Sequence, residues 1–261
     1  MMKKIRILAI GNSFSVDGME YLWHVLRAGG VEEVTLGNLA IGGCSVDQHA
    51  DNVASGAAAY LYGKNTSGVW TWESDQTFLR GLLDEAWDVV TLQQASHYSG
   101  LPETYARQDE ILRYVTSHGR NPDVRLYWHM TWAYQWDSTH PHFAGYGRDR
   151  ATMYGAILRA VQSEVLTRTA YAGVIPAGVA IENLRATPVG DTVTRDGFHL
   201  SESHGRYTAA LTWAQTLCGV DPAAVDWMPD AFAAAISPDL AHIRLAVRAA
   251  ASANIGAPTA V

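Results

Sequence analysis

The alternation of short apolar runs with longer helical stretches constrains the fold of this chain more than any other feature. Apolar runs typical of strands occur at residues 5–10, 31–41, 87–94, 123–132 and 170–176. Stretches with helical periodicity or helix-start signals occur at 17–27, 75–86, 102–118, 146–168 and 201–217. Strands separated by helices pair in parallel through right-handed crossovers. The sequence therefore predicts an α/β fold, a three-layer α/β/α sandwich around a mainly parallel sheet of about five strands.

The chain of 261 residues is expected to form a single domain, since one large α/β domain of this size buries a sufficient core. Two further helical stretches, 222–235 and 238–253, predict a C-terminal helical extension over residues 222–261 that packs on this domain. The Gly-, Ser- and Thr-rich segment 54–71 has poor periodicity and is expected to be a loop.

Charge, cysteine usage and the first apolar run exclude several classes of protein. The formal net charge of −7 argues against a nucleic-acid-binding protein, which would carry a basic face. Cys44 and Cys218 lie far apart without a zinc-type spacing. The run 5–10 is too short for a secretory signal or a membrane span. We expect a cytoplasmic protein with no membrane partner, although a chain trimmed of its signal would look the same. The sequence does not decide whether the protein forms a homo-oligomer.

Residues suited to nucleophilic catalysis follow the first strand and precede a late helix. Ligands of parallel sheets bind beyond the carboxyl ends of the strands, where "GNSFS" (11–15) places Ser13. In "DGFHLS" (196–201), Asp196 precedes His199 by three positions, so its carboxylate can reach Nδ1 and leave Nε2 as a base. A serine hydroxyl needs such a base to attack a carbonyl. The two segments together predict a Ser13–His199–Asp196 triad, with ordinary turns as the alternative.

Two other strand ends carry groups that could stabilise an oxyanion. In "AIGGCS" (40–45), consecutive glycines leave a backbone N–H open to a ligand. In "LQQASH" (92–97), two amides end an otherwise apolar strand, where burial is costly unless each amide has partners. One of these amides is a candidate oxyanion donor.

These four segments together resemble the SGNH, or GDSL-like, hydrolase superfamily over residues 5 to about 217. The resemblance implies the flavodoxin-like SGNH fold, a Ser13 nucleophile, and Asp196 and His199 as its partners. It also implies an oxyanion hole that contains the N–H groups of Ser13 and Gly43.

The sequence departs from the family pattern in two blocks. Asn12 stands where the family commonly has an aspartate. The usual Gly-x-Asn-Asp block is absent, and "LQQASH" occupies its place. Gln94 is expected to replace the missing asparagine in the oxyanion hole, with Gln93, Ser96 and His97 as rivals.

The substrate is suggested by aromatic residues after the fourth strand. The stretch 127–143 is rich in Trp, Tyr and His, and aromatic rings at a site mouth suit sugar rings, whereas packing in the core is the alternative. The expected substrate contacts are Asn12, Gln93, Ser96, His97, His129, Trp132 and Trp136. The His-Pro-His sequence at 140–142 lacks a nearby carboxylate at a ligand spacing, so no metal and no cofactor are expected.

The function these observations favour is a serine esterase that forms an acyl-enzyme. The family resemblance implies acetyl esters of carbohydrates, so the expected partner is a small-molecule or oligosaccharide ester. A lipid or thioester hydrolase, an acyltransferase and a non-catalytic carbohydrate-binding protein remain alternatives. The chain lacks the glycine patterns of nucleotide-binding loops.

Overall fold

The computed structural model describes residues 2–252 and residue 255, and in this part of the chain it contains one seven-stranded sheet in the order β4-β3-β2-β1-β5-β6-β7. Five of these strands are parallel, namely β1 (Lys4–Gly11), β2 (Glu33–Ala40), β5 (Val89–Leu92), β6 (Arg125–His129) and β7 (Tyr171–Ile175). The carboxyl ends of β1, β2 and β5 therefore lie side by side at one edge of the sheet.

The remaining two strands form a hairpin that the sequence did not predict. The segment expected to be a loop, 54–71, contains β3 (Tyr60–Asn65) and the start of β4 (Trp70–Gln76), which pair antiparallel beyond β2. β4 is an edge strand with mostly exposed side chains, so it lacks an apolar pattern. Gly63 in β3 has no side chain and therefore adds nothing to an apolar pattern. Glycine is needed at this position because a Cβ would lie 2.6 Å from the ring of Trp72. The sheet consequently has seven strands rather than five.

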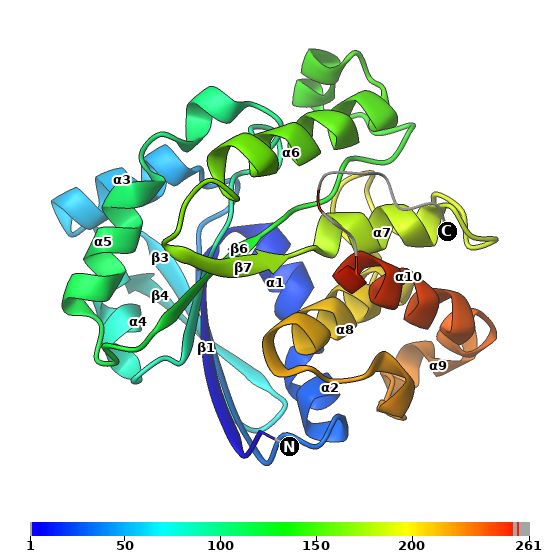
Figure 1. Cartoon of the computed structure of the whole chain (residues 1–261), viewed down its shortest axis with the longest axis horizontal. Coiled ribbons are helices and arrows are strands. Elements are labelled where there is room, and N and C mark those ends of the chain that lie inside the picture. Colours follow the sequence, from blue (N-terminus) through cyan, green and yellow to red (C-terminus); the bar gives the residue numbers. More distant parts are fainter. Residues whose placement is uncertain (1, 253–254, 256–261) are drawn as a thin grey trace.

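Helices cover both faces of the sheet, which confirms the three-layer α/β/α arrangement (Figure 1). One face carries α1 (Ser13–Met19), α2 (Leu22–Ala28), α7 (Ala177–Arg185), α8 (His204–Cys218) and α10 (Leu240–Ser252). The other carries α3 (Val46–Ser55), α4 (Phe78–Asp84), α5 (Gln108–His118) and α6 (Arg150–Glu164). The short elements are η1 (Pro102–Tyr105), η2 (Pro141–Tyr146), η3 (Pro222–Ala224), η4 (Asp230–Phe232), α9 (Ala233–Ile236) and η5 (Ser237–Asp239).

The C-terminal segment packs on the face that carries α7 and α8. The Asn183 side chain in α7 donates a hydrogen bond to the carbonyl of Ala246 in α10 at 3.1 Å. The guanidinium of Arg244 in α10 binds the carbonyls of Pro222 and Val225, which holds the irregular segment before α9. The stretch 222–235, expected to be a helix, is instead two short 3₁₀ turns followed by the start of α9, and the last part of the expected extension lies outside the described residues.

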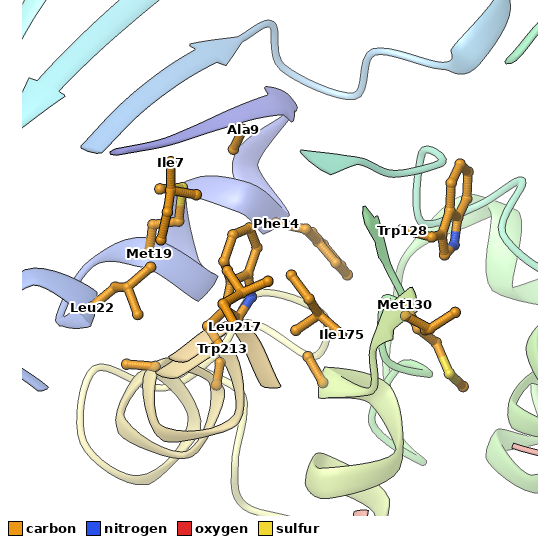
Figure 2. Close-up of a cluster of buried hydrophobic side chains, with 14 of the residues drawn as sticks. Ile7, Ala9, Phe14, Met19, Leu22, Trp128, Met130, Ile175, Trp213 and Leu217 are labelled. Atoms are coloured by element: carbon orange, nitrogen blue, oxygen red, sulfur yellow. The ribbon is translucent and has the colours of Figure 1, made fainter. Parts of the chain in front are cut away.

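The core between the sheet and this face fixes the first helix (Figure 2). Phe14 and Met19 of α1 are buried, and they face the same apolar cluster as Ile7 of β1 and Trp213 of α8. Full burial of such a side chain stabilises the fold by about 1.5–3 kcal/mol. Helix α1 therefore has little freedom to move relative to the sheet. No helix in the described part of the chain has the length and apolar character that crossing a membrane requires.

Candidate active site

Ser13 begins α1 directly beyond the carboxyl end of β1. Asn12 caps this helix by accepting a hydrogen bond from the Phe14 N–H at 3.0 Å, so the helix begins four residues before the start expected at residue 17. Gly11 is required at the turn, because a Cβ there would lie 2.8 Å from the Ser15 hydroxyl. The first residue of a helix has no carbonyl one turn earlier to receive its N–H. Both the hydroxyl and the N–H of Ser13 thus belong to a helix start.

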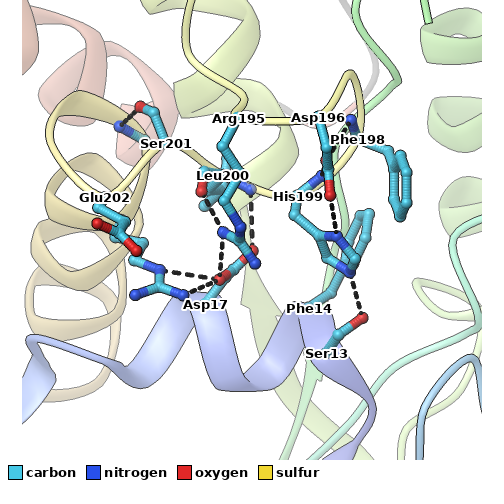
Figure 3. A network of polar contacts seen from close by, with 12 residues as sticks. Ser13, Phe14, Asp17, Arg195, Asp196, Phe198, His199, Leu200, Ser201 and Glu202 are labelled. Atoms are coloured by element: carbon cyan, nitrogen blue, oxygen red, sulfur yellow. Dashed lines mark hydrogen bonds and ion pairs between the residues drawn. The ribbon is translucent and has the colours of Figure 1, made fainter.

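Ser13, His199 and Asp196 form one continuous line of hydrogen bonds (Figure 3). The Ser13 Oγ lies 2.8 Å from Nε2 of His199, and Nδ1 of the same ring lies 2.6 Å from Oδ2 of Asp196. A carboxylate accepts the Nδ1 proton, which leaves the lone pair of Nε2 to receive the serine proton. The structure therefore brings Ser13 and Asp196 each within hydrogen-bond distance of His199, on opposite sides of its ring.

A tight turn holds Asp196 against His199. The Asp196 Oδ1 accepts the backbone N–H of Phe198 at 3.2 Å and that of His199 at 2.7 Å. Gly197, at φ 89°, allows this turn to close. Partial burial raises the pKa of Asp196, but the hydrogen bonds from the His199 ring and from the two N–H groups together lower it below its ordinary value. Asp196 is therefore a carboxylate at neutral pH.

A buried carboxylate ties the histidine loop to the helix that begins with Ser13 (Figure 3). Asp17, one helical turn after Ser13, is 1% exposed and lies 2.9 Å from nitrogens of both Arg195 and Arg206. Its Oδ2 also accepts the N–H of Leu200 at 2.9 Å, and Arg195 in turn binds the Leu200 carbonyl. The sequence analysis did not identify this role, because Arg195 and Arg206 lie almost two hundred positions from Asp17.

The buried amide of Gln93 supports the residue before Ser13. Its Nε2 donates to Oδ1 of Asn12 at 2.8 Å, and its Oε1 lies 2.8 Å from Nδ1 of His129. Asn12 then donates to the carbonyl of Cys44 at 3.1 Å. These bonds link the ends of β6, β5, β1 and the loop after β2. Gln93 and His129 are fully buried and do not line the pocket, so the prediction that they contact substrate is wrong.

The prediction that Gln94 contributes to the oxyanion hole is also wrong. Its Nε2 donates to the carbonyl and the hydroxyl of Thr104, at 2.8 and 3.0 Å. Its Oε1 accepts the N–H groups of Val46 and Ala95. Both amide hydrogens are consequently used inside the fold, and Gln94 does not line the pocket.

Gly43 lines the same pocket as Ser13. It follows Gly42 in a turn closed by the Cys44 N–H and the Ile41 carbonyl at 3.1 Å, and its φ of 65° suits the third position of such a turn. A Cβ at Gly43 would meet nothing within 4 Å, so the residue borders open space. The Gly43 N–H donates no hydrogen bond to any residue that the structure describes.

A pocket of about 430 Å³ opens over the Ser13 hydroxyl. Its lining comprises Asn12, Ser13, Phe14, Gly42, Gly43, Ser96, His97, His140, His142, Phe198 and His199. The predicted contacts Asn12, Ser96 and His97 thus reach the pocket. A larger hollow, of about 500 Å³, lies at the amino ends of the strands, but its lining in the described part of the chain contains no serine, cysteine or histidine.

The two predicted tryptophan contacts lie elsewhere. Trp132 is fully buried and stacks on Phe14, with ring centroids 4.3 Å apart, so it supports the pocket from behind. Trp136 is 67% exposed and lies outside the pocket lining. His140 and His142 line the pocket instead, and the only sequence signal for them was their place in the aromatic stretch. Within the described residues no group of three or more His, Cys, Asp or Glu side chains is arranged to hold a metal ion.

Several solved structures share the fold of this chain. A catalytic mutant of an acetylxylan esterase from Geobacillus stearothermophilus aligns with a TM-score of 0.53 at 11% identity, covering 87% of this chain and 97% of that one. A candidate SGNH hydrolase from Slackia heliotrinireducens aligns with a TM-score of 0.52 at 20% identity, covering 82% of this chain and all of the other. The fold is thus that of the SGNH hydrolases.

The chain belongs to the family described as a domain of unknown function, DUF4886, which matches residues 6–248. A crystal structure of a DUF4886 family protein from Bacteroides uniformis is similar at 35% identity and a TM-score of 0.88, covering 94% of this chain and 93% of that one. No curated protein matches the sequence.

Proposed function

We propose that this protein is a serine hydrolase that cleaves small carboxylic esters through an acyl-enzyme. The observation that carries the proposal is the line of contacts from Ser13 Oγ through His199 to Asp196, at 2.8 and 2.6 Å. This arrangement provides a nucleophile, a base and a carboxylate that orients the base. The SGNH-type fold and the position of Ser13 beyond a parallel strand support the same conclusion.

In the proposed reaction, Ser13 Oγ attacks the ester carbonyl while His199 Nε2 takes the hydroxyl proton. The N–H groups of Ser13 and Gly43 stabilise the oxyanion, and each such donor is worth about 2.7–4 kcal/mol in the transition state. The C–O bond of the ester then breaks, and the alcohol leaves with the proton from His199. Water attacks the acyl-serine with His199 again as base, which releases the acid and restores Ser13.

The pocket lining supports a short acyl group on a polar alcohol. Among the described residues, Phe14 and Phe198 are the only large apolar side chains in it, whereas Ser96, Asn12 and several imidazoles supply polar groups. A lipid hydrolase would need a longer apolar surface. The acetylxylan esterase of similar fold has catalytic mutants in which a serine or an aspartate is replaced, and both residue types flank His199 here. We therefore infer acetyl esters of carbohydrates as the substrate class.

The test combines a covalent probe with an activity assay. A fluorophosphonate is expected to form an adduct on Ser13, identified by mass spectrometry. Ser13→Ala is expected to lose the adduct and to lower kcat for p-nitrophenyl acetate by about 10⁶-fold, the loss typical of a removed triad serine. Ser67→Ala, a change in the exposed β3–β4 turn, serves as the control. Absence of both adduct and hydrolysis in the native protein would overturn the proposal.

A further inference from the structure

Aromatic rings form a continuous wall that begins at the catalytic histidine and runs along one side of the pocket. The ring centroids of His199 and Phe198 lie 4.2 Å apart, and those of Phe198 and His140 lie 4.8 Å apart. His142 follows at 5.7 Å from His140, and His97 at 4.6 Å from His142. All five rings line the pocket, and we refer to His97, His140 and His142 as the imidazole wall.

The imidazole wall has unused hydrogen-bonding capacity. The Nδ1 of His140 accepts the backbone N–H of His142 at 3.3 Å, so a neutral His140 ring carries its proton on Nε2. Within the described part of the chain, no hydrogen bond reaches a ring nitrogen of His97 or His142. A neutral imidazole offers one donor and one acceptor, the same pair of functions that a hydroxyl group offers. The wall is therefore complementary to hydroxyl groups of a ligand.

The wall also lacks compensation for a negative ligand. Among the described residues, no Lys or Arg lines the pocket. Burial and the neighbouring His142 and His140 lower the pKa of His97 to about 4. Burial and the neighbouring His142 and His199 likewise lower the pKa of His140, against the opposite effect of Asp196. An anionic group in a pocket without Lys or Arg loses hydration without gaining a fixed cationic partner.

We propose that His97, His140 and His142 form the subsite for the alcohol portion of the ester and select neutral, hydroxyl-bearing alcohols over anionic ones. This inference rests on the proposed esterase function, because it assigns the side of the pocket away from the acyl group. The imidazoles bind the leaving sugar and take no part in proton transfer to or from Ser13.

A matched pair of substrates tests the selection. Mono-acetylated methyl glucoside and mono-acetylated methyl glucuronide differ by one carboxylate, and kcat/KM is measured for both at pH 8. The glucoside is expected to be the better substrate by about ten-fold or more. His142→Phe is expected to raise KM for the glucoside by about 3–10-fold, which corresponds to one lost neutral hydrogen bond, and to lower kcat/KM for the glucoside more than for p-nitrophenyl acetate.

A loss of the selectivity provides the sharper test. His142 is exposed, and His142→Arg places a fixed cation on the wall, which is expected to improve the glucuronide relative to the glucoside by about ten-fold. His118→Arg makes the same change on an exposed face of α5 and is expected to leave this ratio unchanged.

The outcomes separate this inference from the proposed function. Equal rates for the two sugars in the native protein, or equal losses for sugar and p-nitrophenyl esters in His142→Phe, overturn the inference alone. No hydrolysis of any ester overturns the proposed function. Calorimetric titration of both sugar esters into Ser13→Ala then still decides the inference, since tighter binding of the glucoside supports it and equal binding contradicts it.

Discussion

Asp196 shows how much of the site depends on single side chains. Its two carboxylate oxygens have different partners, since Oδ2 faces Nδ1 of His199 whereas Oδ1 closes the turn through the N–H groups of Phe198 and His199. An amide at this position can keep the turn through its oxygen. It cannot accept the Nδ1 proton with a second oxygen, so the imidazole loses its orientation and its tautomer.

We therefore expect Asp196→Asn to preserve the fold while lowering kcat for p-nitrophenyl acetate by about 10⁴-fold, the loss seen when a triad carboxylate becomes an amide. Circular dichroism checks the fold, and steady-state kinetics checks kcat. The matched control is Asp137→Asn, an exposed aspartate in the loop after β6 that lies outside the pocket lining. A kcat within ten-fold of the native value would show that Asp196 does not orient the base.

At the scale of elements, the site depends on the attachment of one loop to one helix. The loop 194–203 carries Asp196 and His199, and α1 begins with Ser13. Asp17 joins them, because it lies in α1 and binds Arg195 and the Leu200 N–H in the loop as well as Arg206 in α8. The distance between Ser13 and His199 is consequently held by an ion-pair network and not by their own hydrogen bond alone.

Removal of this buried charge is expected to be costly. Asp17→Asn leaves two arginines without their carboxylate, and we expect the free energy of unfolding in urea to fall by about 2–4 kcal/mol. The value lies below that for a fully buried pair, because the Arg195 side chain is 35% exposed. The control Asp47→Asn, at an exposed position in α3, should change the free energy of unfolding by less than about 0.5 kcal/mol. Equal stabilities for the two variants would contradict the role of Asp17. The folded Asp17→Asn protein should also have a reduced kcat.

At the scale of the whole molecule, two histidines are buried without charge in separate parts of the fold. His49 lies 2.9 Å from the Tyr60 hydroxyl between α3 and β3, and His129 lies at the end of β6 beside Gln93. Burial lowers the pKa of each ring to about 3. In the unfolded chain both titrate near 6.5, so the unfolded state binds more protons than the folded state below that pH.

The sign of this linkage predicts loss of stability in acid. The contribution of the two rings is fully present above pH 6.5, and it decreases as the pH falls from 6.5 towards 3. Each ring lowers the free energy of unfolding by up to about 1.4 kcal/mol per pH unit in that range. Urea unfolding between pH 8 and pH 4 measures the slope, and His129→Gln should reduce it by the share of one ring. A stability that is constant from pH 7 to pH 4.5 would contradict the prediction.

The sequence by itself determined the parallel part of the sheet and the edge of the sheet at which the candidate site lies. The strand runs and the groups at their ends are local signals, since the residues involved are neighbours in the chain. The same is true of Asp196 and His199, whose three-residue spacing within one turn allows the contact at 2.6 Å. Ser13 could be predicted to lie nearby because carboxyl ends of parallel strands share one edge of the sheet.

Only the tertiary structure decided how the other polar and aromatic side chains are used. Gln94 and Trp132 were expected to contact a ligand, but each has a partner inside the fold. Gln94 binds Thr104 in the short helix η1, and Trp132 stacks on Phe14 of α1, which is distant in the chain. The partners of Asp17 arrive in the same way from the C-terminal part of the domain. A buried polar group must find a partner wherever the fold supplies one, so its direction follows from packing and not from its neighbours in sequence.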